Sequence, residues 1–113
     1  MTASELQRQV KTALEGLDLP VTKDFSEYDG IYPHLVYREI SNVPAFHSDN
    51  REDFFRAVYQ VAIVTDNDEY ETAESAVEAA MLGLGFMRTD ATDIFDDGDF
   101  CRVLRFTITA KKN

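Results

Sequence analysis

The chain has 113 residues, and its 44% content of hydrophobic residues suits one ordinary core, so we expect a single domain over residues 1–113. A net charge of -10 at pH 7 disfavours nucleic acid and anionic membrane surfaces as partners. No apolar run approaches the roughly 18 residues that cross a bilayer, and the charged, amphipathic start is unlike a secretion signal. These features predict a cytosolic protein. A single cysteine, Cys101, excludes an intramolecular disulfide and a multi-cysteine zinc site, and its place in a strand suggests a small buried or half-buried group.

The first predicted element is a helix over residues 3–16. Thr2 followed by Glu5 has the spacing of a capping box, and Gly16 offers a C-terminal stop. Between them the apolar residues recur at near-helical spacing. They are Leu6, Val10 and Leu14, with Leu17 just beyond.

Three strands are predicted next, over residues 21–25, 34–40 and 54–65, because these segments are rich in β-branched and aromatic residues. The Pro, Asn, Ser and Asp residues between positions 41 and 50 predict a long exposed connection, and hence a hairpin with an extended tip. Phe46, close to Pro44, is an aromatic residue within this polar connection. It either folds back onto the core or anchors a partner.

The strand over residues 54–65 is apolar on both faces, and a chain of this length has little material to cover both. The missing cover is either a second layer of the same chain or a neighbouring subunit, and we expect oligomerisation. The residues predicted to lie at the subunit contact are Phe54, Val58 and Val64.

A second helix is predicted after Asp66 and Glu69, which have capping spacing, and Gly83 and Gly85 end it near Phe86. A final pair of strands, roughly residues 85–89 and 100–110, flanks a loop that contains the turn dipeptide Asp97-Gly98. The element order predicts an α+β fold: an antiparallel sheet of four to five strands with both helices packed on one face.

Two acidic runs stand out. Five aspartates fall between residues 90 and 99, but the EF-hand pattern fails because Phe95 occupies a ligand position and Leu104 stands where the glutamate belongs. This run is a solvated hairpin tip that discourages edge pairing, a weak divalent-ion site or a partner contact. The run from Asp66 to Glu78 is a solvated helix face or a docking surface for a basic partner.

Signals for catalysis are weak. His34 and His47 are the only histidines, and a dyad of Cys101 with either depends on spatial proximity that the sequence does not give. Phosphate-binding glycine loops, HExxH and CxxC are all absent from the sequence. We therefore predict a protein that is not an enzyme.

Several of these elements together form a longer sequence pattern. In chain order it consists of Tyr32-Pro33-His34-Leu35-Val36-Tyr37, a polar loop, the strand from Phe55 to Ile63, a helix, Gly85-Phe86 and a final Arg102-Val103-Leu104-Arg105-Phe106. This order resembles the tail completion proteins of long-tailed bacteriophages, also called tail terminators or tail-to-head joining proteins. The similarity extends from the first helix to the last strand.

The resemblance implies an α+β structural protein without cofactor, which forms six-membered rings, caps the tail tube and meets the head connector. It implies assembly in the bacterial host cytoplasm and a final place in the virion. The family has no compact functional motif, so the resemblance implies only regions of partner contact. These regions are the loop around Phe46 and the hairpin over residues 90–99. These contacts are Pro44, Phe46, His47, Asp93, Asp96, Asp97 and Asp99.

A second hypothesis belongs to a different class. The net charge and the two acidic runs also suit a regulatory or inhibitor domain that binds a basic protein surface, including one that normally holds nucleic acid.

Overall fold

The computed structural model describes residues 1–28, 30–45, 54–96 and 98–112, with the side chain of Asp96 left out. It is an α+β fold of two helices and a five-stranded sheet, which confirms the predicted fold class. The elements are α1 (Ala3–Glu15), β1 (Val21–Lys23), β2 (His34–Pro44), β3 (Phe54–Thr65), α2 (Glu71–Gly83), β4 (Met87–Asp96) and β5 (Asp99–Lys111).

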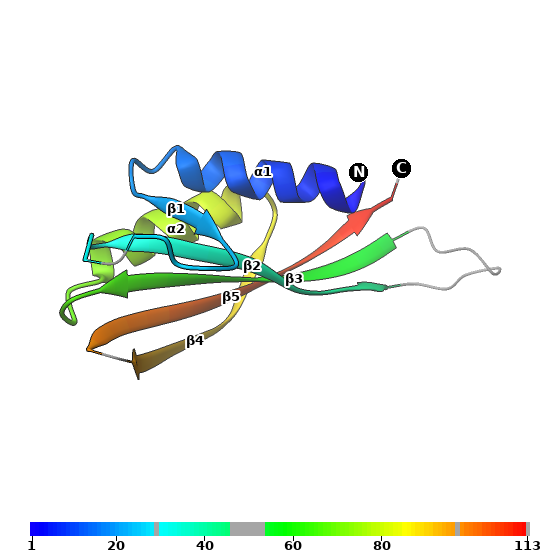
Figure 1. Ribbon diagram of the computed structural model, residues 1–113. Helices are drawn as coiled ribbons and strands as arrows, with labels where there is room; N and C mark the ends of the chain where they lie inside the picture. The colour runs from blue at the N-terminus through cyan, green and yellow to red at the C-terminus, as the bar shows by residue number, and fades with distance from the viewer. Residues whose placement is uncertain (29, 46–53, 97, 113) are drawn as a thin grey trace.

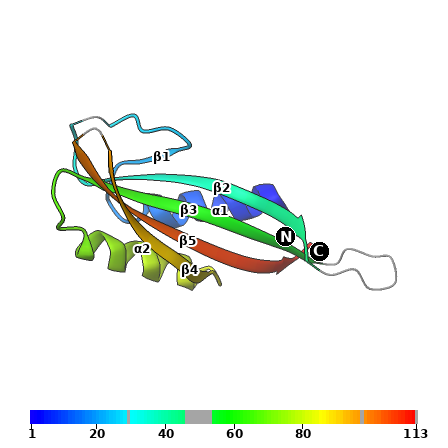
Figure 2. The same cartoon turned by 90° about the horizontal axis from the view of Figure 1, so that it is seen from below.

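Both helices lie on the same side of the sheet, whose strand order is β1-β2-β3-β5-β4 (Figures 1 and 2). We call the helix-covered side the inner face and the opposite side the outer face. One hydrophobic core fills the space between the helices and the inner face. Its largest fully buried side chains include Tyr59, Phe106 and Leu35.

The first helix forms as its sequence predicts. The Thr2 hydroxyl accepts a hydrogen bond from the Glu5 backbone N–H at 3.1 Å and so satisfies one of the unpaired donors of the first turn. The predicted apolar stripe is buried at Leu6, Val10 and Leu14. In α2 the same periodicity buries Ala73, Val77 and Met81.

The antiparallel prediction is wrong for β1, which pairs with β2 in parallel over Val21–Lys23. Because the chain between β1 and β2 returns to the end of the sheet from which β1 starts, the two strands run in the same direction. β1 is also shorter than predicted, since Asp24 adopts a positive φ of 70° that ends the strand.

β2 is longer than predicted and continues to Pro44, so the first part of the expected connection is sheet. A bulge between Glu39 and Ser41 shifts the register, and pairing with β3 then continues to Pro44 opposite Phe55. Polar side chains are compatible with this pairing because the ladder uses only backbone groups.

The prediction for the last hairpin was wrong over a longer segment. β4 runs from Met87 to Asp96, so Asp90 and Asp93 lie within a strand and not in a loop. β4 is the sheet edge, where carboxylates can point to solvent while the backbone pairs with β5 on one side only.

The predicted cap of the second helix is also wrong. The helix begins at Glu71, and its N-cap, Tyr70, makes no side-chain capping bond. The preceding residues form a turn in which the Asn67 side chain accepts from the Glu69 N–H at 2.8 Å. After the helix, Gly85 takes a φ of 101°, a conformation that L side chains rarely adopt, and so permits the reversal into β4.

Candidate functional site

The outer face of the sheet carries the residues predicted to contact a neighbouring subunit. Along β3, Ala57, Tyr59, Val61 and Ile63 are buried on the inner face, so the alternate residues Phe54, Val58 and Val64 project from the outer face. Figure 2 shows this face with the helices behind it. Phe54 and Val58 are half-buried, whereas Val64 is only 7% exposed.

Val64 lies in the part of the outer face that the chain covers itself. Its cross-strand partner on β2 is His34, which is 1% exposed. The His34 Nδ1 donates to the Ile31 carbonyl at 2.7 Å, which leaves Nε2 to accept from the Ser26 hydroxyl at 2.8 Å. The segment between β1 and β2 thus folds over this corner, and Val64 has little surface left for another subunit.

The same geometry bears on the His–Cys dyad. His34 and Cys101 lie opposite Val64 on its two sides, in β2 and β5. Two strand spacings separate their backbones by about 10 Å, and both nitrogens of His34 are already hydrogen-bonded to the covering segment. This arrangement makes His34 a structural residue. His47 lies outside the described residues.

Elsewhere the outer face is mixed in chemistry. Half-buried Val36, Ala62 and Val103 form an apolar row across β2, β3 and β5. The next row holds Arg38, Gln60 and Arg105, and both arginines are exposed. The strand is therefore apolar on two faces, but its outer face is interrupted by charge.

One end of the molecule carries the first predicted partner contact. Pro44 is exposed at the end of β2, opposite Phe55, and Phe54 lies opposite Lys111 at the start of β3. Phe46 and His47 lie outside the described residues, so the two interpretations of Phe46 both stand.

The opposite end, at the β4–β5 hairpin, carries the second predicted contact. The Asp99 carboxylate accepts from the Tyr32 hydroxyl at 2.6 Å, and Asp93 pairs with Arg102 at 3.1 Å while its side chain stays 65% exposed. Asp96 is the last residue of β4. Asp97 lies outside the described residues.

An aromatic pair that was not predicted also lies at this end. Phe95 and Phe100 face each other across the hairpin with ring centroids 4.9 Å apart, and they are 66% and 38% exposed. Exposed aromatic residues of this kind are common anchors in protein interfaces. Their symmetrical placement around Asp97-Gly98 was the available signal, but it becomes visible only once the hairpin register is known.

Arg102 ties the second helix to the sheet beside this aromatic pair. Its guanidinium donates to Glu74 at 2.6 Å and to Asp93 at 3.1 Å and lies 4.9 Å from the centre of the Tyr70 ring. The hydrogen bond to Glu74, more than any other contact, raises the pKa of Arg102 above its ordinary value. Glu78 also pairs, with Arg88 at 3.3 Å. Part of the second acidic run therefore stabilises the fold.

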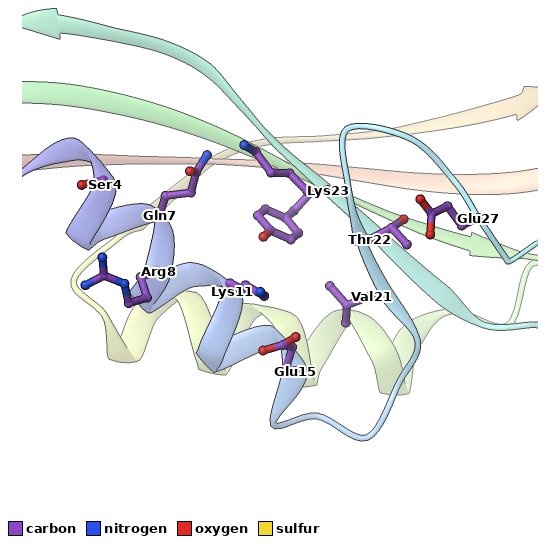
Figure 3. A pocket seen from close by; sticks show the side chains of 10 residues that line it. Ser4, Gln7, Arg8, Lys11, Glu15, Val21, Thr22, Lys23 and Glu27 are labelled. Carbon is purple, nitrogen blue, oxygen red and sulfur yellow. The ribbon is translucent and has the colours of Figure 1, made fainter.

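A groove of about 640 Å³ runs between α1 and β1 (Figure 3). Arg8 and Lys11 project from the helix and Lys23 from the strand, whereas Glu15 lies at the end of α1 and Glu27 beyond Thr22. Tyr37 also lines the groove, and burial, followed by the charges of Glu15 and Asp24, raises the pKa of its phenol.

In the part of the chain that the structure describes, no three His, Cys, Asp or Glu side chains come close enough together to bind a metal ion. No described helix is both long and apolar enough to cross a membrane.

The geometry therefore offers surfaces: an outer face that the chain covers only at one corner, an exposed aromatic pair at one end, Pro44 at the other end, and a charged groove at one edge. Comparison with known proteins finds no family model that matches the chain and no curated protein of significantly similar sequence.

Proposed function

We propose that this chain is a structural assembly protein that caps the tail tube of a long-tailed bacteriophage and joins it to the head connector. The observation that carries the proposal is the separation of two exposed contact regions along one elongated sheet. Pro44 lies at one end of β2, and the Phe95–Phe100 pair lies at the opposite end of the sheet. The Cα positions extend 51 × 23 × 22 Å, so the long axis is more than twice either of the others.

This separation suits a joining role, because one subunit can contact a different partner at each end (Figure 1). The hairpin end offers rigid aromatic side chains beside carboxylates, a combination that gives both contact area and specificity. The other end offers exposed Pro44, at the end of β2 opposite Phe55. We assign the tail tube and the head connector to these two ends, without fixing which end meets which partner.

A ring of identical subunits, with six copies favoured by the family resemblance, completes the proposal. Phe54 and Val58 remain proposed contact residues on the outer face, whereas Val64 does not because its own chain buries it. Assembly would take place in the bacterial cytoplasm and the ring would remain in the virion.

The decisive experiment adds purified chain to tail tubes that lack their terminating protein. We expect tubes to stop elongating and to carry a ring at one end in electron micrographs, and we expect capped tubes to bind heads. Phe95→Ser/Phe100→Ser should reduce capping or head joining without unfolding the chain, whereas Met87→Ser, an exposed apolar residue elsewhere on β4, is the matched control. Tubes that elongate normally with excess chain would contradict the proposal.

The acidic regulatory function is the second candidate, and one observation favours it. Asp68, Glu71 and Asp90 are exposed, and they pair with no basic residue in the described part of the chain. Such a domain should capture a basic protein at low salt and release it at high salt. Capture that persists at high salt would contradict this second function.

A further inference from the structure

Opposite charges lie at opposite edges of the sheet. The strand order places β1 at one edge and β4 at the other. We define the basic groove as Arg8, Lys11 and Lys23, between α1 and β1. We define the acidic edge as four residues: Asp90 and Asp93 on β4, Glu71 at the start of α2, and Asp68 in the turn before it.

The cations of the basic groove are available to a partner. Arg8, Lys11 and Lys23 are all exposed. None of the three forms an ion pair with a carboxylate of the described residues. In a chain of net charge -10, this groove therefore brings together three cations, against the two carboxylates Glu15 and Glu27 of the same lining.

The acidic edge has the opposite imbalance. Residues 57–87 contain no Lys or Arg, and the nearby Arg102 and Arg88 are already paired with Glu74, Asp93 and Glu78. Asp68 and Glu71 line one pocket with Asp93, so three carboxylates lie around a single hollow at this edge. Negative charge therefore remains at the surface after the internal ion pairs are satisfied.

From these observations we infer that the basic groove of one copy receives the acidic edge of the next copy. The inference rests on the proposed function, because it names the lateral contact of the proposed ring. Two different surfaces on opposite edges make a head-to-tail contact, which generates a ring when the rotation between copies closes. Complementary charge fixes the orientation of such a contact and suppresses the alternatives.

A second copy fits the groove better than a nucleic acid does. The groove also contains Glu15 and Glu27, and the whole chain repels a polyanion, whereas a short acidic edge can contact the cations alone. The contact uses side chains, because the β1 edge offers only the three backbone positions of Val21–Lys23 and a bulge between Arg88 and Asp90 interrupts the β4 edge. Bulges of this kind hinder backbone pairing between sheets.

The test is a charge exchange between two full-length variants. Lys11→Glu/Lys23→Glu reverses the groove, and Asp68→Lys/Glu71→Lys reverses the edge. Each alone places like charges together, and we expect self-association to weaken about tenfold or more at low salt. Mixing the two variants should restore assembly, because each reversed surface then meets its complement. Native mass spectrometry and sedimentation at low and high salt provide the measurement.

Restoration by alternating copies also predicts that only rings with an even number of subunits close in the mixture. Arg38→Glu is the control, a charge reversal at an exposed arginine of the outer face on β2 that belongs to neither charged surface, and it should assemble as the unmodified chain does. Circular dichroism melting checks that every variant folds. If the lysine substitutions at the start of α2 prevent folding, Asp68→Asn/Glu71→Gln supplies a milder version, which should weaken assembly less.

Two outcomes separate the inference from the proposed function. An unmodified chain that forms rings while both charge variants assemble equally well would overturn the lateral contact and leave the proposed function standing. Loss of assembly in the Arg38→Glu control alone would move the subunit contact to the outer face and overturn the lateral contact as well. An unmodified chain that stays monomeric, alone and on tail tubes, would overturn both.

Discussion

The two faces of the sheet differ in what they contribute. On the inner face, Tyr59, Phe106 and Leu104 are fully buried beneath the helices. On the outer face of the same sheet, Val58, Val103 and Thr107 are only half-buried, and Arg38 and Arg105 are exposed. Stability therefore comes mainly from one face, and the other face is free to change its chemistry without unfolding the chain.

The largest expected effect on stability comes from a substitution on the inner face. Phe106→Ala removes a fully buried ring and should lower the free energy of unfolding by about 3–5 kcal/mol. Val103→Ala, on the outer face of the same strand, should cost about 1 kcal/mol or less because its side chain is half-exposed. Urea denaturation measures both. Equal losses would contradict the division between the two faces.

A smaller effect tests the junction between α2 and the sheet. Arg102→Gln removes the charged hydrogen bonds to Glu74 and Asp93 and should cost about 1–2 kcal/mol. Arg105→Gln, an exposed arginine on the outer face, is the control and should change stability by less than about 0.5 kcal/mol. A double-mutant cycle with Glu74→Gln isolates the coupling. Absence of coupling would show that the ion pair contributes nothing to this junction.

The next effect appears only at alkaline pH. Burial and the neighbouring Glu39 carboxylate raise the pKa of Tyr59 well above its ordinary value of 10.0. Because the folded chain holds this phenol protonated more strongly than the unfolded chain does, the related stability is complete below about pH 10 and falls as the pH rises further. The loss should be about 1 kcal/mol near pH 11.

Tyr59→Phe isolates this pH effect. The Tyr59 hydroxyl is buried near Glu39 but meets no partner at hydrogen-bonding geometry among the described residues, so the substitution should cost little near neutral pH. The variant should then lose less stability than the unmodified chain between about pH 9 and about pH 11. Some dependence of stability on pH remains in the variant, because the pKa of Tyr37 is also raised. An unchanged slope would assign the alkaline loss to other groups.

The smallest effect on folding concerns the outer face. Val58→Ser should change the free energy of unfolding by about 1 kcal/mol or less, because the side chain is half-buried. If the outer face contributes to the proposed subunit contact, the same substitution should reduce self-association at any salt concentration. Sedimentation measures this, with Thr107→Ser, on the paired position of β5, as the control. Equal association of the two variants would exclude Val58 from the contact.

Some elements could be predicted because local pattern and tertiary packing agree. β3 begins at Phe54 and ends at Thr65 as expected, since its alternating apolar residues serve the core. The first helix follows from the Thr2 cap and the spacing of Leu6, Val10 and Leu14. In these segments, the side chains whose pattern predicts the helix or strand are also the side chains that become buried in the core.

The errors fall where backbone pairing decides the structure. Asp90 and Asp93 suggest a loop by composition, yet an edge strand tolerates them because their carboxylates reach solvent. The parallel pairing of β1 depends on how the following segment returns, which no local pattern encodes. The burial of Val64 beside His34 likewise depends on contacts of residues thirty or more positions away.

The candidate surfaces were predictable only in part, for the same reason. Asp93 and Asp99 could be named from the acidic run, but their partners Arg102 and Tyr32 could not. The basic groove was missed altogether. Its cations come from α1 and β1, two segments whose proximity appears only in the folded chain.

The strand order has a geometric consequence for the size of any ring built through the two sheet edges. Neighbouring strands in a sheet rotate by about 20–25° relative to each other, so the direction of β4 relative to β1 accumulates over the intervening strands. The twist of the sheet would then set the rotation between successive copies, and this rotation determines how many copies close a ring. A substitution that reduces the sheet twist would therefore change the number of subunits without altering the residues of the contact.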